Sequence, residues 1–118
     1  MSIVFRTVMF AAALGLAGTG RPALAAGQDA PQVEKGTAVY MAQKCSICHS
    51  IAGQGKKDLP LDGVGKKLSA AEIRAWIVTP KEMEKKTNST KKPPMPDRYG
   101  KLPAADVDAL VAYLVSLK

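Results

Sequence analysis

The sequence lacks several features that would assign it to common protein classes. It has no convincing alternation typical of strands, no internal repeat and no apolar run long enough to span a bilayer comfortably. Aromatic residues make up only 5% of the chain, which disfavours nucleic-acid binding despite a net charge of +7. What remains is a helix-forming chain of 118 residues, enough for one small domain.

Both cysteines and the only histidine lie together in Cys45-Ser46-Ile47-Cys48-His49. On a helical turn, residues three apart share a face, so both thiols can reach the two vinyl groups along one side of a porphyrin. His49, the next residue, then directs its imidazole at the iron. The pattern is typical of covalent c-type haem attachment, and we predict one haem c linked through Cys45 and Cys48.

Three other interpretations of this motif fit less well. A structural zinc site needs four ligands, and the chain has no second Cys/His cluster. A thioredoxin-like pair needs a βαβ context and a thiolate of low pKa. A disulfide between Cys45 and Cys48 would close so short a loop that it would stabilise little.

Residues 1–25 have the layout of a cleavable signal peptide. Arg6 precedes an apolar run, and Ala23-Leu24-Ala25 stands before a polar stretch. We therefore expect export to the periplasm, with an uncleaved membrane anchor as the alternative. Cleavage would remove Arg6 and Arg21 and no acidic residue, which lowers the net charge from +7 to +5. Positive charge suggests acidic protein partners or loose association with an anionic membrane surface, while export and the few aromatic residues argue against nucleic acid.

The remaining chain predicts an all-α domain after a flexible leader at residues 26–32. The first helix is expected from about Val33 to Lys44. Its apolar face would hold Val33, Thr37, Tyr40 and Met41. Gly36 lies inside this helix at a cost of about 1 kcal/mol relative to Ala, which makes sense where another helix crosses closely.

The segment after the motif, residues 50–65, is rich in glycine and predicts turns rather than regular structure. Ser69-Ala70-Ala71-Glu72 is a capping box and predicts a helix that ends at about Val78. The spacing of its apolar residues predicts a buried face of Ile73, Trp76 and Ile77. Trp76 is expected in the core or against the haem or one of its propionates.

Two further helical segments are expected, a turn around residues 81–86 and a last helix from Pro103 or Ala104 to Leu117. The last helix has a continuous apolar stripe of Val107, Leu110, Val111 and Leu114, with Tyr113 and Leu117 at its border. Between the two segments, Pro93-Pro94-Met95-Pro96 predicts an extended stretch with little backbone freedom.

The ligand opposite His49 determines what a bound haem can do. With no second histidine, the candidates are Met41, Met83, Met95, a lysine or an open iron. Met41 lies on the helix that leads into the motif and cannot easily turn to the opposite face, and Met83 lies between two glutamates. Met95 is favoured because its prolines reduce the entropy lost in holding a thioether on iron. Thioether ligation would raise the haem potential.

These motifs resemble a class I, single-haem bacterial cytochrome c over residues 33–118. The resemblance rests on the attachment motif, Met95-Pro96, and on Gly36, Tyr40, Leu110 and Tyr113-Leu114. It implies a small cytochrome c fold of three to five helices wrapped around one covalently bound haem. It also implies that the N- and C-terminal helices cross at Gly36, with Tyr40, Leu110 and Tyr113 packed there. Cys45 and Cys48 would form thioether links, with His49 as proximal and Met95 as distal ligand.

One departure from the family pattern concerns the carbonyl that orients the histidine. The family's Gly-Pro-x-Leu corresponds to Asp58-Leu59-Pro60-Leu61, so we expect the carbonyl of Leu59 or Pro60 to accept from the His49 ring. The expected haem-pocket residues are Leu59, Pro60, Leu61, Trp76 and Pro94.

Together these features predict a periplasmic single-electron carrier and not an enzyme. The expected partners are redox proteins with acidic docking surfaces, and the protein is expected to be a monomer unless it is an enzyme subunit. Clustered lysines near the haem edge would steer such partners; the candidates are Lys56, Lys57, Lys85, Lys86, Lys91 and Lys92. The alternatives are a dedicated cytochrome subunit of a larger periplasmic oxidoreductase, with an apolar patch beside the haem, or a peroxidase-like enzyme or sensor with an open iron.

Overall fold

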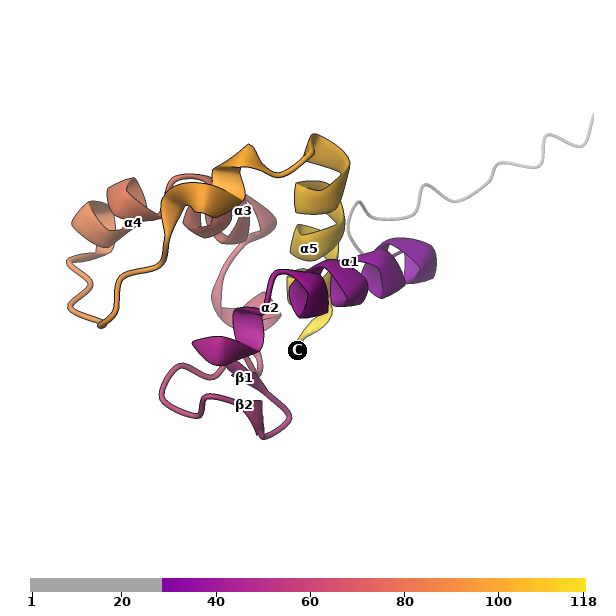
Figure 1. Cartoon of the computed structure of the whole chain (residues 1–118), viewed down its shortest axis with the longest axis horizontal. Helices are drawn as coiled ribbons and strands as arrows, with labels where there is room; N and C mark the ends of the chain where they lie inside the picture. The colour runs from indigo at the N-terminus through magenta and orange to yellow at the C-terminus, as the bar shows by residue number, and fades with distance from the viewer. Residues whose placement is uncertain (1–28) are drawn as a thin grey trace, which may run out of the picture.

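The computed structural model describes residues 29–118, which form a mostly helical domain (Figure 1). The elements in chain order are α1 (Ala30–Ala42), η1 (Cys45–Ile47), β1 (Ser50–Ile51), β2 (Gln54–Gly55), α2 (Val64–Lys67), α3 (Ala70–Val78), α4 (Pro80–Thr87), η2 (Asp97–Lys101) and α5 (Ala104–Ser116). The all-α prediction is confirmed. The expected signal peptide lies outside the described residues, as does the leader up to residue 28.

Helix α1 begins earlier than its apolar pattern indicates, at Ala30 instead of Val33. Pro31 stands in its first turn, where a missing N–H costs nothing, so residues 30–32 are helical and not part of the leader. The buried face consists of Gly36, Val39 and Tyr40. The prediction that Met41 shares this face is wrong: its side chain is 70% exposed, because one residue of helix turns it about 100° from Tyr40.

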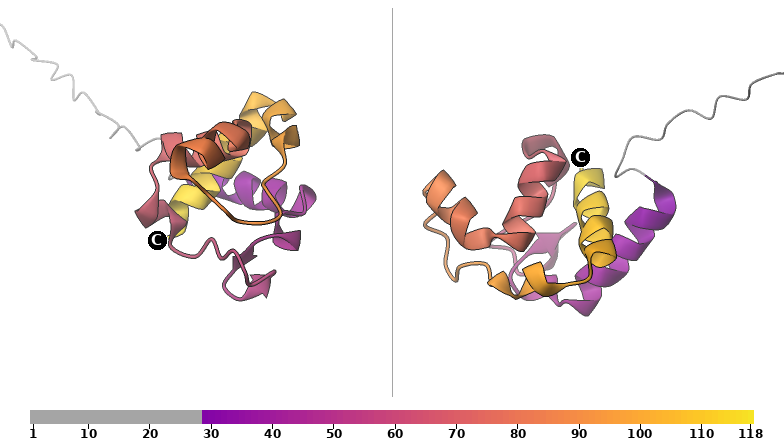
Figure 2. Two further views of the ribbon diagram at one scale, coloured as in Figure 1. Left: turned by 90° about the vertical axis from the view of Figure 1, so that its left-hand side faces the viewer. Right: turned by 90° about the horizontal axis from the view of Figure 1, so that it is seen from above.

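Helices α1 and α5, the first and last of the described chain, cross in direct contact (Figure 2). A Cβ atom built on Gly36 would lie 2.6 Å from the Cβ of Tyr113 and 2.7 Å from the carbonyl carbon of Ala109. Only glycine therefore allows the two backbones to approach so closely. Beside this point the rings of Tyr40 and Tyr113 meet edge to face, with centroids 5.7 Å apart, and Leu110 is buried.

The capping box gives α3 the start and length that the sequence predicts. The Ser69 hydroxyl accepts from the backbone N–H of Glu72 at 3.2 Å, and the Glu72 carboxylate accepts from the N–H of Ser69 at 3.2 Å. Ile73 and Ile77 of this helix are buried, whereas Trp76 is only half-buried. The turn expected at residues 81–86 is the longer helix α4, which begins at Pro80.

Residues 50–65 contain more regular structure than their turn residues predict. Ile51 pairs with Gln54 in the short antiparallel hairpin of β1 and β2, whose tip includes Ala52 and Gly53 at positive φ. The α2 turn packs against the end of α5, and the N–H of Gly65 donates to the carbonyl of Leu117 at 2.8 Å. A contact across more than fifty residues leaves no local pattern in the sequence.

One hydrophobic core joins α1, α3 and α5. It contains Tyr40 of α1 and Ile73 and Ile77 of α3. The predicted stripe of α5 is also buried here, namely Val107, Leu110, Val111 and Leu114. No helix in residues 29–118 has both the length and the apolar composition needed to cross a membrane.

Candidate haem-binding site

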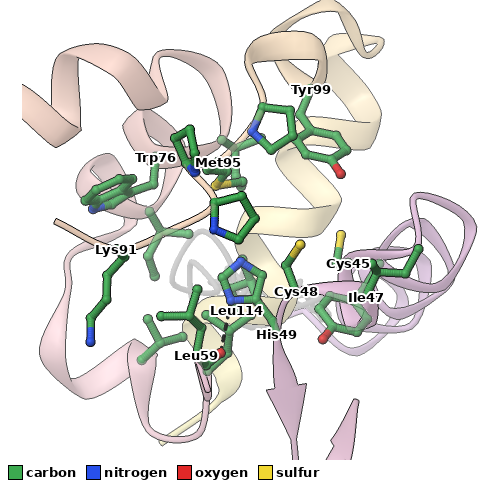
Figure 3. Close-up of a pocket in the computed structure, with 18 of the residues that line it drawn as sticks. Cys45, Ile47, Cys48, His49, Leu59, Trp76, Lys91, Met95, Tyr99 and Leu114 are labelled. Carbon is green, nitrogen blue, oxygen red and sulfur yellow. Dashed lines mark hydrogen bonds between the residues drawn. The ribbon is translucent and has the colours of Figure 1, made fainter. Parts of the chain in front are cut away.

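A cavity of about 450 Å³ opens beside this core (Figure 3). Its volume falls in the range of roughly 300–1,000 Å³ typical of small-molecule and cofactor sites. Segments far apart in the sequence line it. The expected site residues that line it are Cys45, Cys48, His49, Leu59, Pro60, Leu61, Trp76, Pro94 and Met95. Two of the expected helix-crossing residues, Tyr40 and Leu110, line it as well, while Gly36 and Tyr113 do not.

A sharp change of chain direction places the cysteine motif on this cavity. Lys44 takes a left-handed conformation with φ of 55°, which ends α1 and starts the single turn η1. The backbone N–H of His49 donates to the carbonyl of Cys45 at 2.9 Å. As a result Cys45, Cys48 and His49, all half-buried, lie along one stretch of the cavity wall.

The ring of His49 is held in one tautomer. Its Nδ1 lies 3.0 Å from the carbonyl oxygen of Leu59, and because a carbonyl only accepts, Nδ1 carries the proton. Nε2 therefore keeps its lone pair, the form in which imidazole binds a metal. Burial lowers the pKa of His49 below its ordinary value, although the bond to Leu59 opposes this shift. Of the two carbonyls that the sequence left open, Leu59 and Pro60, it is therefore that of Leu59 that orients the His49 ring.

The proline-rich segment brings Met95 to the same cavity. Figure 3 shows the Met95 side chain facing the space above the His49 ring, from a different part of the chain. Met95 is half-buried and packs against the hydrophobic core. Among the methionines of residues 29–118, Met83 is buried away from the cavity and Met41 is exposed. Met95 is therefore the methionine of residues 29–118 that lines the cavity.

The cysteine environment does not suit a reactive thiolate. Burial raises the pKa of the Cys45 thiol to about 11. A thioredoxin-like pair depends on the opposite shift, because the thiolate is the nucleophile.

The Tyr40 hydroxyl provides a test of whether the cavity fits a bound group. It is buried and finds no hydrogen-bond partner within residues 29–118, and Tyr40 lines the cavity. Burial raises its pKa to about 12, so it is a neutral donor. A buried hydroxyl without a hydrogen-bond partner is costly unless a ligand or a water molecule accepts a hydrogen bond from it. A largely apolar cavity with a thioether, an imidazole and two thiols in its wall has the donor set of a covalently held haem.

Several cavity residues were not anticipated from the sequence. Tyr99 of η2 is buried and lines the cavity, as do Lys44, Ile47 and Arg98. The Arg98 guanidinium donates to the Tyr99 hydroxyl at 2.9 Å. Periodicity could not reveal Tyr99, since it lies on a short 3₁₀ turn and not on an amphipathic helix. Its position four residues after Met95 was the only available signal.

The six candidate docking lysines do not form one group around the cavity. All are exposed, but they stand on the hairpin side (Lys56 and Lys57), on α4 (Lys85 and Lys86) and on the proline segment (Lys91 and Lys92). Lys56 pairs with Asp58 at 3.6 Å. Of the six, Lys91 alone lines the cavity.

Fold and site together define a small helical domain suited to one covalently linked haem. The family model for cytochrome c matches residues 33–118, and the chain belongs to the cytochrome c family. No curated protein and no solved structure matches it. The family binds covalently attached haem c, which indicates haem-based electron transfer.

Proposed function

We propose that the protein is a periplasmic single-electron carrier with His49 and Met95 as axial haem ligands. The observation that carries the proposal is the convergence of the His49 imidazole and the Met95 thioether on one cavity beside Cys45 and Cys48. When bound, haem supplies a one-electron couple between ferrous and ferric iron.

The residues around the site favour electron transfer over catalysis. The Leu59 carbonyl fixes His49 as a neutral ligand, and the prolines beside Met95 restrict the chain that carries the thioether. If His49 and Met95 hold the two axial positions of the iron, no position would stay open to a substrate. Apolar residues of the wall, including Leu61, Ile77 and Leu114, exclude water.

The partners are proposed to be redox proteins with acidic surfaces. Exposed lysines at several points of the described chain, among them Lys57, Lys86 and Lys92, would accelerate encounter with such partners in a salt-dependent way. The export-type layout of residues 1–25 supports the periplasmic location.

The optical spectrum of the ferric protein tests the axial ligands. We expect the methionine–iron charge-transfer band in the wild type and in Met41→Ala, and its loss in Met95→Ala. Met41 is a matched control because its side chain is 70% exposed and does not line the cavity. Met95→Ala should also bind cyanide or carbon monoxide much faster. A band that is absent from the wild type, or that survives in Met95→Ala, would refute the assignment.

A second candidate function is that of a dedicated cytochrome subunit of a larger periplasmic oxidoreductase. The exposed side chain of Ile47, 64% accessible between the two cysteines, favours it, since an apolar contact beside the haem would suit a lasting complex. Purification of the native protein under mild conditions separates the two candidates. A stable stoichiometric complex that Ile47→Ser dissociates supports the subunit, and a free monomer supports the carrier.

A further inference from the structure

The two cysteines and two of the hydrogen-bond donors of the cavity wall lie on different sides of the cavity. In Figure 3 the sulfur atoms of Cys45 and Cys48 lie on one side, and Trp76 and Lys91 lie on the other. Trp76 carries one indole N–H and Lys91 carries an ammonium group, so both can only donate hydrogen bonds. Ser89, two residues before Lys91, also lines the cavity.

The end of α4 explains how Ser89 and Lys91 reach the cavity. Asn88 takes a left-handed conformation with φ of 53°, and the N–H of Ser89 donates to the carbonyl of Glu84 at 3.0 Å. The chain therefore turns back after Thr87. The backbone N–H of Lys91 then donates to the Ser89 hydroxyl at 3.4 Å, which leaves the hydroxyl proton free to donate elsewhere.

The positions of the substituents on haem c explain why the cysteine side and the Trp76–Lys91 side of the cavity differ. In haem c the thioether bonds form at the two vinyl groups, and the two propionates stand on the opposite edge of the macrocycle. Attachment at Cys45 and Cys48 therefore directs the propionates toward the side of Trp76 and Lys91. Carboxylates that leave bulk water need donors, and a charged donor serves best.

We propose that Lys91, with the Ser89 hydroxyl and the Trp76 indole, forms the propionate-binding end of the haem site. Lys91 is thereby distinguished from the other exposed lysines and is not part of the partner-docking surface. The inference rests on the proposed function only for the attachment of haem at Cys45 and Cys48; it does not depend on Met95 or on any partner.

The other charged residues of the wall do not serve this role. Lys44 directly precedes Cys45, and Arg98 donates to the Tyr99 hydroxyl and acts electrostatically on Cys45, which places both toward the cysteine side. Asp58 and Glu84 also line the cavity, but carboxylates repel propionates. Lys91 makes no ion pair with any residue of the described chain, so its ammonium group is available.

The test compares Lys91→Gln with Lys92→Gln in the haem-loaded protein. Both changes remove one charge from the same exposed segment, but Lys92 does not line the cavity. The readouts are the midpoint potential and the paramagnetic proton resonances of the propionate methylenes. Loss of the Lys91 charge should stabilise the ferric form and lower the equilibrium constant for reduction by about two- to tenfold, where tenfold corresponds to ~59 mV for one electron.

Lys91→Gln should also shift the propionate resonances, Lys91→Arg should largely restore both readouts, and Lys92→Gln should leave them near the wild-type values. Equal effects of the two glutamine variants would show a general surface charge and overturn the proposal, as would unchanged resonances in Lys91→Gln. The charge-transfer band is recorded in parallel. A wild type without that band refutes Met95 ligation while the comparison between Lys91 and Lys92 stays valid, so the two failures are distinguishable.

Discussion

Replacement of Gly36 by alanine tests the helix crossing, because two effects of opposite sign on the free energy of unfolding act at this position. On helix propensity alone, Gly36→Ala should stabilise α1 by about 1 kcal/mol. The new Cβ, however, would overlap the carbonyl of Ala109 and lie 2.6 Å from the Cβ of Tyr113. The carbonyl is backbone and cannot rotate away, so α1 and α5 would have to separate. Overpacking of this kind costs about 1–3 kcal/mol, and here the upper end applies.

We therefore expect a net loss of about 2 kcal/mol in the free energy of unfolding and a decrease of roughly 10 °C in Tm. The measurement is denaturant and thermal unfolding of the haem-loaded protein, followed by far-UV circular dichroism. The matched control is Ala38→Gly, the reverse exchange at an exposed position of the same helix, which should cost about 1 kcal/mol. If Gly36→Ala is as stable as the wild type or more stable, the steric argument is wrong.

Two further predictions concern pH and capping. In the haem-free protein, burial lowers the pKa of His49 below its ordinary 6.5, so its contribution to stability is fully present above pH 6.5 and is lost as the pH falls through the lowered value. The test uses haem-free protein, because a His49 bound to iron would not titrate in this range. His49 is the only histidine, so unfolding titrations from about pH 8 to pH 5 should show it, and constant or rising stability on acidification would contradict this. Ser69→Ala removes the cap of α3 and should cost about 1 kcal/mol by denaturant unfolding. Ser116→Ala, near the end of α5, should cost less, and equal losses would argue against the cap.

The helices with strong local signals were predictable from the sequence. The capping box at Ser69 acts over four residues, and the apolar stripe of α5 repeats with the period of the helix, so both could be placed without tertiary information. The start of α1 was less predictable, because Pro31 is compatible with either a first helical turn or an extended leader. The side of α1 that is buried depended on where α5 crosses, and Met41 consequently stands outside the core.

The features of the candidate site fall into the same two groups, those that the sequence predicts and those that only the folded structure reveals. The motif from Cys45 to His49 and the proline-held Met95 carry their chemistry in residue type and spacing, so they were recognisable in sequence alone. The orienting carbonyl was not: Leu59 and Pro60 are neighbours, and only the path of the folded loop brings the Leu59 oxygen to 3.0 Å from the His49 ring. The unpaired Tyr40 hydroxyl is likewise a property of packing that no pattern encodes.

The sequence by itself predicted haem attachment at Cys45 and Cys48, because that chemistry needs only a short, contiguous set of side chains. Only the tertiary structure determined which side of the cavity is formed by each of the segments that lie far apart in the sequence. Lys91 and Lys92 are equivalent in sequence terms, yet the turn after α4 places only Lys91 on the cavity wall. The physical reason is that direction and burial are set by contacts between segments remote along the chain, and such contacts leave no local pattern.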